Sequence, residues 1–162
     1  MFMVEEPYGI SQFQAWLISL TLGIVLYRRK KRGEKYIQSL YMRVRLRKSP
    51  RIDKKFRVTF ENGKIVDFGA RGYSDYTLHK NPLRMRSYVT RHGGFVPHMI
   101  QKQTDLKLVH KNMLDVTRSD KENWTKTGFF TAGFWSRWLL WSHPELEGAK
   151  KIISKKFGLS FL

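Results

Sequence analysis

The stretch FRVTFENGKIVDF, residues 56–68, decides the fold of this chain. Apolar and polar residues alternate over 56–60, which is the period of a half-buried β-strand, and residues 64–68 are predicted as the return strand. Asn62-Gly63 lies between the two runs and is the strongest short hairpin signal, because both residues tolerate a positive φ. The sequence therefore predicts an antiparallel hairpin over about 55–68.

A third strand is predicted before the hairpin. Apolar and basic residues alternate over 42–47, and Pro50 follows shortly after the run. A period of two places Arg43, Arg45 and Arg47 on one side of a half-buried strand. We therefore expect a cationic outer face, and we interpret these three arginines as contacts to a partner.

The residues after the hairpin predict a loop and then a helix. Gly69 and Gly72 permit a close approach of the loop backbone, and two tyrosines in 69–77 are expected to pin the loop to the body of the domain. Asn81-Pro82 supplies a cap followed by proline at the first helical position. The apolar stripe of this helix comprises Leu83, Met85, Tyr88 and Val89, and the loop adds three candidate partner contacts, Arg71, Tyr73 and Tyr76.

The rest of the chain predicts mainly helices. Residues 95–121 have no firm period and are interpreted as an elaboration with short helical pieces, while Trp124 is expected in the core or at a docking surface. Residues 131–141 predict a short buried helix, and residues 142–158 predict a terminal helix that Gly158 ends. Three tryptophans spaced i, i+3 and i+6 are expected in the core or, alternatively, on a ridge that docks a partner: Trp135, Trp138 and Trp141. The expected fold class is α+β, a small antiparallel sheet packed with several short helices.

Charge divides the chain into two parts. The 162 residues include 31 Lys and Arg but 13 Asp and Glu, and none of the basic residues precedes residue 28. A strongly basic block is attracted to nucleic acid, anionic lipid head groups or acidic protein surfaces. The chain has no cysteine, which excludes disulfides, thiolate metal sites and a cysteine nucleophile.

The N-terminal part predicts a membrane anchor. From Pro7 to Tyr27 the chain has 21 residues without a formal charge, and about 20 helical residues span the hydrocarbon layer of a bilayer. Acidic residues precede this run and cations follow it, so the positive-inside rule leaves the basic part in the cytosol. The residues expected in the anchor are Tyr8, Trp16, Leu17, Ile18, Leu20, Leu22, Ile24, Val25, Leu26 and Tyr27.

Five cations directly follow the predicted anchor. We expect them to contact lipid head groups or another polyanion, at about 1 kcal/mol per cation near an anionic surface. Two alternatives remain open: a helix buried in protein instead of lipid, and a nuclear-localisation or nucleic-acid patch. The five residues are Arg28, Arg29, Lys30, Lys31 and Arg32. The predicted domains are an anchor with its basic flank at 1–33 and a basic α+β domain at 34–162.

Three separated blocks carry a resemblance to a known family. They are FGARGYSDYTLHKNPLRMRSYVTRH, then ENW, then TAGFWSRWLLWSHPELEGAKKIISKKFGL. In this order they resemble a family of small basic proteins of nucleocytoplasmic large DNA viruses, of the chlorella-virus-like kind, over about residues 55–162. The chain departs from the family pattern by its long stretch between Gly94 and Asp120, and by an N-terminal apolar segment that many members lack.

The resemblance implies a structural role. Some members of that family look like minor capsid proteins, which lie beneath the outer shell of an icosahedral virion and above its internal membrane. The resemblance therefore implies a virion location and contacts with the major capsid protein, other minor capsid proteins and lipid. Self-association is left open, and before assembly the chain would sit at host cytoplasmic membranes.

No enzymatic motif emerges from the sequence. Five histidines occur without a compact metal-ligand spacing, and no phosphate-binding glycine motif is present. A nuclease in which Asp75, His79 and His92 converge is conceivable, but a cap at Asp75 and a backbone hydrogen bond at His79 explain these residues more simply. We expect no catalytic residue, cofactor or metal. The rival function is a basic nucleic-acid-binding protein packaged in the virion, because arginines and aromatics abound.

Overall fold

The computed structural model describes residues 42–162. The predicted anchor at 8–27, the basic run at 28–32 and the predicted domain boundary at 33 therefore lie outside the described residues. Within 42–162 no helix has both the length and the apolar character that crossing a membrane requires.

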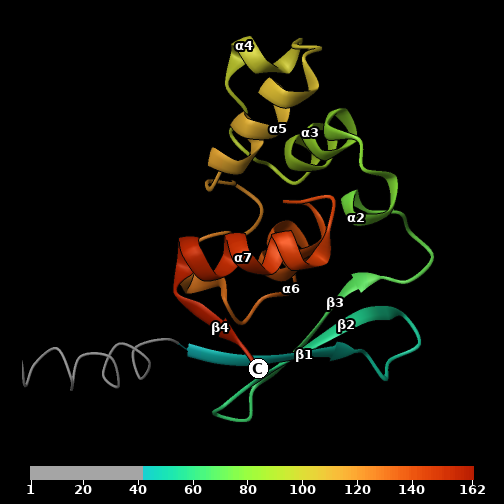
Figure 1. The fold of residues 1–162 in the computed structure, drawn as a ribbon, viewed down its shortest axis with the longest axis vertical. Coiled ribbons are helices and arrows are strands. Elements are labelled where there is room, and N and C mark those ends of the chain that lie inside the picture. The colour runs from blue at the N-terminus through green and yellow to red at the C-terminus, as the bar shows by residue number, and fades with distance from the viewer. Residues whose placement is uncertain (1–41) are drawn as a thin grey trace, which may run out of the picture. The chain divides into compact units, whose positions relative to one another are not determined.

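A four-stranded sheet forms one layer of the domain (Figure 1). Its strands are β1 (Met42–Lys48), β2 (Lys54–Phe60), β3 (Ile65–Ala70) and β4 (Leu159–Phe161), in the spatial order β3-β2-β1-β4. β2 pairs antiparallel with both β1 and β3, whereas β4 pairs parallel with β1. The α+β class is confirmed, but the sheet is mixed and not purely antiparallel as expected.

The predicted hairpin over about 55–68 is confirmed. Gly63 has a φ of 81° at the turn, and the amide of Phe60 donates to the carbonyl oxygen of Lys64 at 2.9 Å. The side chain of Asn62 accepts from the amide of Lys64 at 3.1 Å, which closes the turn locally. Residue types that tolerate a positive φ thus set the register of β2 against β3.

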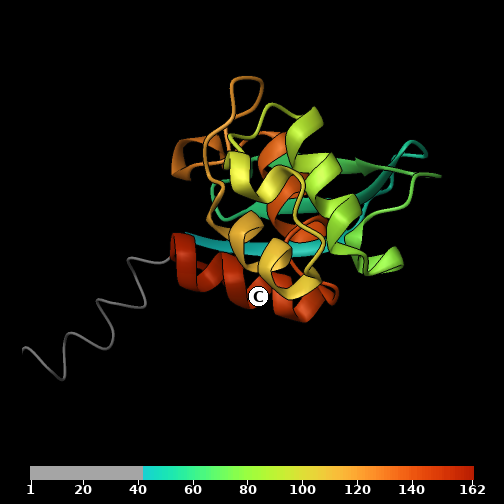
Figure 2. The same ribbon diagram turned by 90° about the horizontal axis from the view of Figure 1, so that it is seen from above.

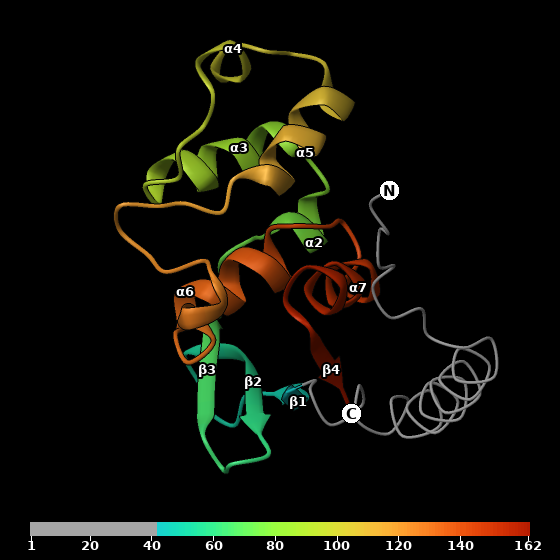
Figure 3. The same ribbon diagram turned by 90° about the vertical axis from the view of Figure 1, so that its left-hand side faces the viewer.

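One face of the sheet packs on helices, and its apolar positions are turned toward them. The helix α6 (Ala132–Trp135), the π-helical turn η2 (Ser136–Leu140) and the helix α7 (Leu146–Phe157) cover this face (Figure 3). The sheet residues that build the core there are Val44, Val58, Phe60, Val66, Phe68 and Leu159, with Leu46, Phe56 and Phe161 packed beside them. The opposite face of the sheet carries no helix among the described residues (Figure 1).

Four shorter helices form a further layer beyond α6 and α7 (Figure 1). They are α2 (Tyr76–His79), α3 (Pro82–Arg91), α4 (His98–Gln101) and α5 (Leu106–Asp115), and a short 3₁₀ turn, η1 (Lys126–Gly128), precedes α6. Asn81 caps α3 as predicted, because its side chain accepts from the amide of Leu83 at 2.9 Å. The short helical pieces expected within 95–121 are α4 and α5, and α3 packs against α5 (Figure 2).

The tryptophans lie in the core, as one of the two interpretations predicted. Trp124, Trp135 and Trp138 are fully buried, and Trp141 is 8% exposed. They therefore offer no ridge on the surface for a partner. The terminal helix α7 ends at Gly158, which has a φ of 71°, as predicted. It starts at Leu146 and not at residue 142 as expected, and the hydroxyl of Ser142 donates to the carbonyl oxygen of Trp138 instead.

Candidate docking face and polar pocket

The open face of the sheet carries the arginines that the alternation predicted. Arg43, Arg45 and Arg47 are exposed on β1, next to the outward positions of β2. Arg43 forms an ion pair with Glu61 at 2.6 Å. Within residues 42–162, Arg45 and Arg47 form no ion pair, so both keep their positive charge available to a partner.

A polar network fixes the middle of the same face. Arg57 donates two hydrogen bonds to Asp67, at 2.9 and 2.8 Å, and the hydroxyl of Ser49 donates to Asp67 at 2.6 Å. The hydrogen bonds from Arg57 and then from Ser49 hold the pKa of Asp67 below its usual value, against the effect of burial. Asp67 neutralises Arg57, so the net charge of the face comes from β1. We call the outward positions of β1, β2 and β3 the docking face, with Arg45 and Arg47 as its free cations.

The three loop residues predicted as partner contacts differ in their exposure to solvent. Arg71 is exposed, and its guanidinium donates to the carbonyl oxygen of Lys54 at 3.2 Å. Tyr73 is 75% exposed, so it is free to contact a partner but does not pin the loop as expected. Tyr76 is 3% exposed in the first turn of α2. Its assignment as a partner contact is therefore a mistake, because it packs in the core and has no surface to offer.

The histidines do not form a metal centre. Within the described chain no group of three or more His, Asp or Glu side chains is arranged to hold a metal ion. His79 accepts from the amide of Asn81 at 3.0 Å, and burial, with a smaller effect of Arg84, lowers its pKa. His92 pairs instead with Glu122. The other three histidines lie elsewhere: His98 at the start of α4, His110 against the carbonyl oxygen of Ser142, and His143 beside Glu145.

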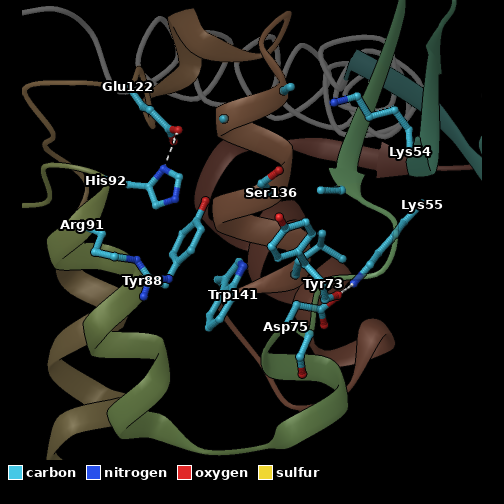
Figure 4. A pocket seen from close by; sticks show the side chains of 16 residues that line it. Lys54, Lys55, Tyr73, Asp75, Tyr88, Arg91, His92, Glu122, Ser136 and Trp141 are labelled. Atoms are coloured by element: carbon cyan, nitrogen blue, oxygen red, sulfur yellow. Dashed lines mark hydrogen bonds and ion pairs between the residues drawn. The ribbon is translucent and has the colours of Figure 1, made fainter.

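A pocket of about 320 Å³ lies between the end of the hairpin, α3 and the turn η2 (Figure 4). We call it the polar pocket. Sixteen residues line it: Lys54, Lys55, Gly69, Ala70, Tyr73, Ser74, Asp75, Tyr88, Arg91, His92, Glu122, Ala132, Gly133, Ser136, Leu140 and Trp141. Asp75 and His92, which the sequence suggested as converging residues, both line it, whereas His79 does not.

Each carboxylate of the polar pocket is held by a specific partner. Asp75 accepts from the Nζ of Lys55 at 2.6 Å and also caps α2 through the amide of Thr77. Glu122 accepts from the Nε1 of Trp124 at 2.7 Å, and its other oxygen lies 2.8 Å from the Nδ1 of His92. A carboxylate held at both oxygens fixes the orientation of the imidazole that it contacts.

Sequence reasoning missed most of this pocket. Lys55, Tyr88, Glu122 and Ser136 had no predicted role in a site, because they come from distant segments that only the fold brings together. One signal was present in the sequence. Glu122 belongs to the short ENW block, and its carboxylate contacts a tryptophan two residues later.

One comparison with known proteins finds a partial similarity. Residues 44–92 are similar to a family of unknown function (DUF5754), and the match runs from β1 through the hairpin to the end of α3. No curated protein matches the chain. No solved structure matches it either. The matched residues thus include Arg45 and Arg47 of the docking face and one wall of the polar pocket, but the match names no function.

Proposed function

We propose that this chain is a structural protein of a large icosahedral DNA virus. In this proposal it is a minor capsid protein whose basic domain binds acidic surfaces of shell proteins, while its N-terminal segment anchors in the internal membrane. The observation that carries the docking part is the open face of the sheet, with Arg45 and Arg47 exposed and without ion pairs among the described residues. The viral setting and the anchor rest on the resemblance and on the apolar run at 8–27.

The composition of the docking face favours a protein partner over nucleic acid. Arginine is enriched at protein interfaces, and the docking face combines Arg45 and Arg47 with the half-exposed apolar side chain of Ile65. Non-specific binding of single-stranded nucleic acid relies on aromatic side chains that stack on bases. None of the outward positions of the four described strands carries an aromatic ring.

The mechanism of attachment is electrostatic and repetitive. A single exposed ion pair contributes only about 0.2–1 kcal/mol, and physiological salt screens charges beyond about 8 Å. Two or three such pairs give weak binding on their own. Many copies in one lattice, each also held at the membrane, would raise the effective concentration and turn weak contacts into a firm attachment.

Cross-linking mass spectrometry of purified particles tests this proposal. Lys48 directly follows Arg47 at the end of β1 and is exposed, so an amine-reactive reagent should join it to capsid proteins. The charge reversal R45E/R47E should abolish these cross-links and reduce incorporation of the chain at least tenfold. The matched control K107E/K111E makes the same change in net charge on α5, away from the sheet (Figure 1). It should leave the cross-links and the incorporation of the chain unchanged.

Two results would contradict the proposal. One is absence of the chain from particles. The other is tight binding of the full chain to nucleic acid at physiological salt, with a steep loss of affinity as salt rises and with the same sensitivity to R45E/R47E. The second result would establish the nucleic-acid-binding rival instead.

A further inference from the structure

Small side chains line much of the polar pocket. Six of its sixteen lining residues are glycine, alanine or serine. At Gly133 a β-carbon would lie 2.7 Å from the Oε2 of Glu122, and at Gly69 one would lie 2.6 Å from the Cδ1 of Leu140, so glycine at these two positions lets those side chains approach the backbone closely. The volume of about 320 Å³ lies within the range of small-molecule sites. None of the three arginines of β1 lines the pocket, although Lys55 of β2 does, so the pocket lies apart from the free cations Arg45 and Arg47.

Tyr88 places an unused hydroxyl in this pocket. Its ring is 5% exposed and stacks between Trp141, at 4.3 Å and 5°, and His92, at 4.1 Å. The hydroxyl is buried and finds no hydrogen-bond partner within the described residues. In Figure 4 it is directed into the space between His92 and Ser136. Burial, and secondarily the charge of Glu122, raise the pKa of Tyr88, so the hydroxyl remains a donor at physiological pH.

The Glu122–His92 pair supplies a second group that faces the pocket. The carboxylate only accepts hydrogen bonds, so the Nδ1 of His92 donates to it at 2.8 Å. The Nε2 is consequently turned to the opposite side of the ring, where it forms no hydrogen bond with any described residue (Figure 4). The buried hydroxyl of Tyr88 is costly to leave without a hydrogen-bond partner, and the Nε2 of His92, whose side chain is 38% exposed, adds an acceptor at the same site.

Arg91 gives the entrance of the pocket a free positive charge. Three cations line the pocket, Lys54, Lys55 and Arg91, together with the carboxylates of Asp75 and Glu122, and Lys54 is paired with Asp53 at 3.6 Å. Lys55 already neutralises Asp75, and His92 holds Glu122. Arg91 is exposed at the rim and forms no ion pair within residues 42–162. A ligand that enters therefore meets hydroxyl donors inside and uncompensated positive charge at the entrance.

We propose that the polar pocket binds a small phosphate monoester. The hydroxyls of Tyr88 and Ser136 donate to its phosphate oxygens, the Nε2 of His92 accepts from a protonated phosphate oxygen, and Arg91 neutralises its charge from the rim. A phosphate offers more acceptor oxygens and more negative charge than a carboxylate, which matches the two hydroxyl donors and the free guanidinium of Arg91.

Binding of phenyl phosphate to the full chain in mild detergent, followed by isothermal titration calorimetry, tests this site. The wild type should bind one equivalent, and acetate should not compete. Y88F should raise the dissociation constant at least tenfold. Because Y88F removes only an unpaired hydroxyl and keeps the ring stack, it should leave the melting temperature of the ligand-free protein unchanged or slightly higher. If Tyr88 had only a structural role, Y88F would not weaken ligand binding while leaving the melting temperature unchanged.

The same helix provides the charge control. R91Q should weaken binding of phenyl phosphate at least fivefold, whereas R84Q, an equally exposed position of α3 that does not line the pocket, should not. Two oligonucleotides, one with a 5′-phosphate and one with a 5′-hydroxyl, test whether the pocket binds the end of a nucleic acid and not a small ligand. Y88F should not change the affinity of the chain for either oligonucleotide. Absence of saturable binding, equal effects of R91Q and R84Q, or an oligonucleotide that loses affinity in Y88F would overturn the proposal.

Discussion

Arg137 carries a positive charge into the centre of the domain. The side chain is fully buried, and no carboxylate forms an ion pair with it among the described residues. Its guanidinium lies 4.4 Å from the ring of Trp138 and donates to the carbonyl oxygen of Trp141 at 3.0 Å. It also donates to the carbonyl oxygens of Met113 and Val116, at the negative end of the α5 dipole. Burial lowers its pKa to about 10, so Arg137 is charged at neutral pH and carbonyl groups take the place of a counterion.

Replacing Arg137 by methionine tests this arrangement at the residue scale. Methionine fills much of the volume but donates no hydrogen bond, so buried carbonyl oxygens lose their partner at about 1–3 kcal/mol each. We expect R137M to lower the free energy of unfolding by about 2–5 kcal/mol in urea denaturation. The exposed R118M serves as control and should change it by less than about 0.5 kcal/mol. An R137M variant as stable as the wild type would show that the buried charge does not hold the layers together.

At the scale of single elements, short sequence motifs correctly predicted the features that depend on neighbouring residues. The turn at Asn62-Gly63, the cap at Asn81 and the stop at Gly158 each depend on a few adjacent residues, and all three lie as expected. The strand β4 went unpredicted because three residues carry no period, and its pairing with β1 joins distant parts of the chain. The polar pocket was missed for the same reason: of the three residues considered as a converging set, Asp75 and His92 line it and His79 does not.

The element that closes the sheet provides the next prediction. Leu159 is fully buried in β4, opposite Met42 of β1, whereas Leu162 is 61% exposed just beyond the strand. L159A should lower the free energy of unfolding by about 2–4 kcal/mol, because it leaves a cavity beneath α7. L162A makes the same chemical change at the surface and should have an effect below about 0.5 kcal/mol. Equal urea midpoints for the two variants would mean that β4 does not contribute to the core.

At the scale of the whole molecule, charge and hydrophobicity separate along the chain. Residues 42–162 hold 25 basic and 10 acidic residues, whereas residues 7–27 hold none of either. The proposal that the N-terminal part anchors in lipid while the cationic domain binds shell proteins rests on this uneven distribution of charge. A domain held at a membrane meets its partners in two dimensions, which increases the benefit of repeated weak contacts.

Membrane extraction of the full chain tests that proposal. A helix inserted in hydrocarbon resists high salt and alkaline carbonate, whereas a chain bound through its cations is released when salt screens them. We expect both treatments to leave the wild type in the membrane fraction and detergent to release it. As a comparison, replacing the five cations at 28–32 by glutamine should not release the protein. Release by carbonate alone would remove the spanning helix from the proposal.

The parallel pairing of β1 with β4 has a consequence for biosynthesis. The amide of Leu162 donates to the carbonyl oxygen of Val44 at 2.9 Å, so the first described strand completes its hydrogen bonds with residues translated long after it. During translation the hairpin can form early, but one edge of β1 stays unpaired and open to other nascent chains until β4 leaves the ribosome. The alternating arginines on that strand then act as gatekeepers, since like charges on neighbouring nascent chains repel and delay edge-to-edge aggregation.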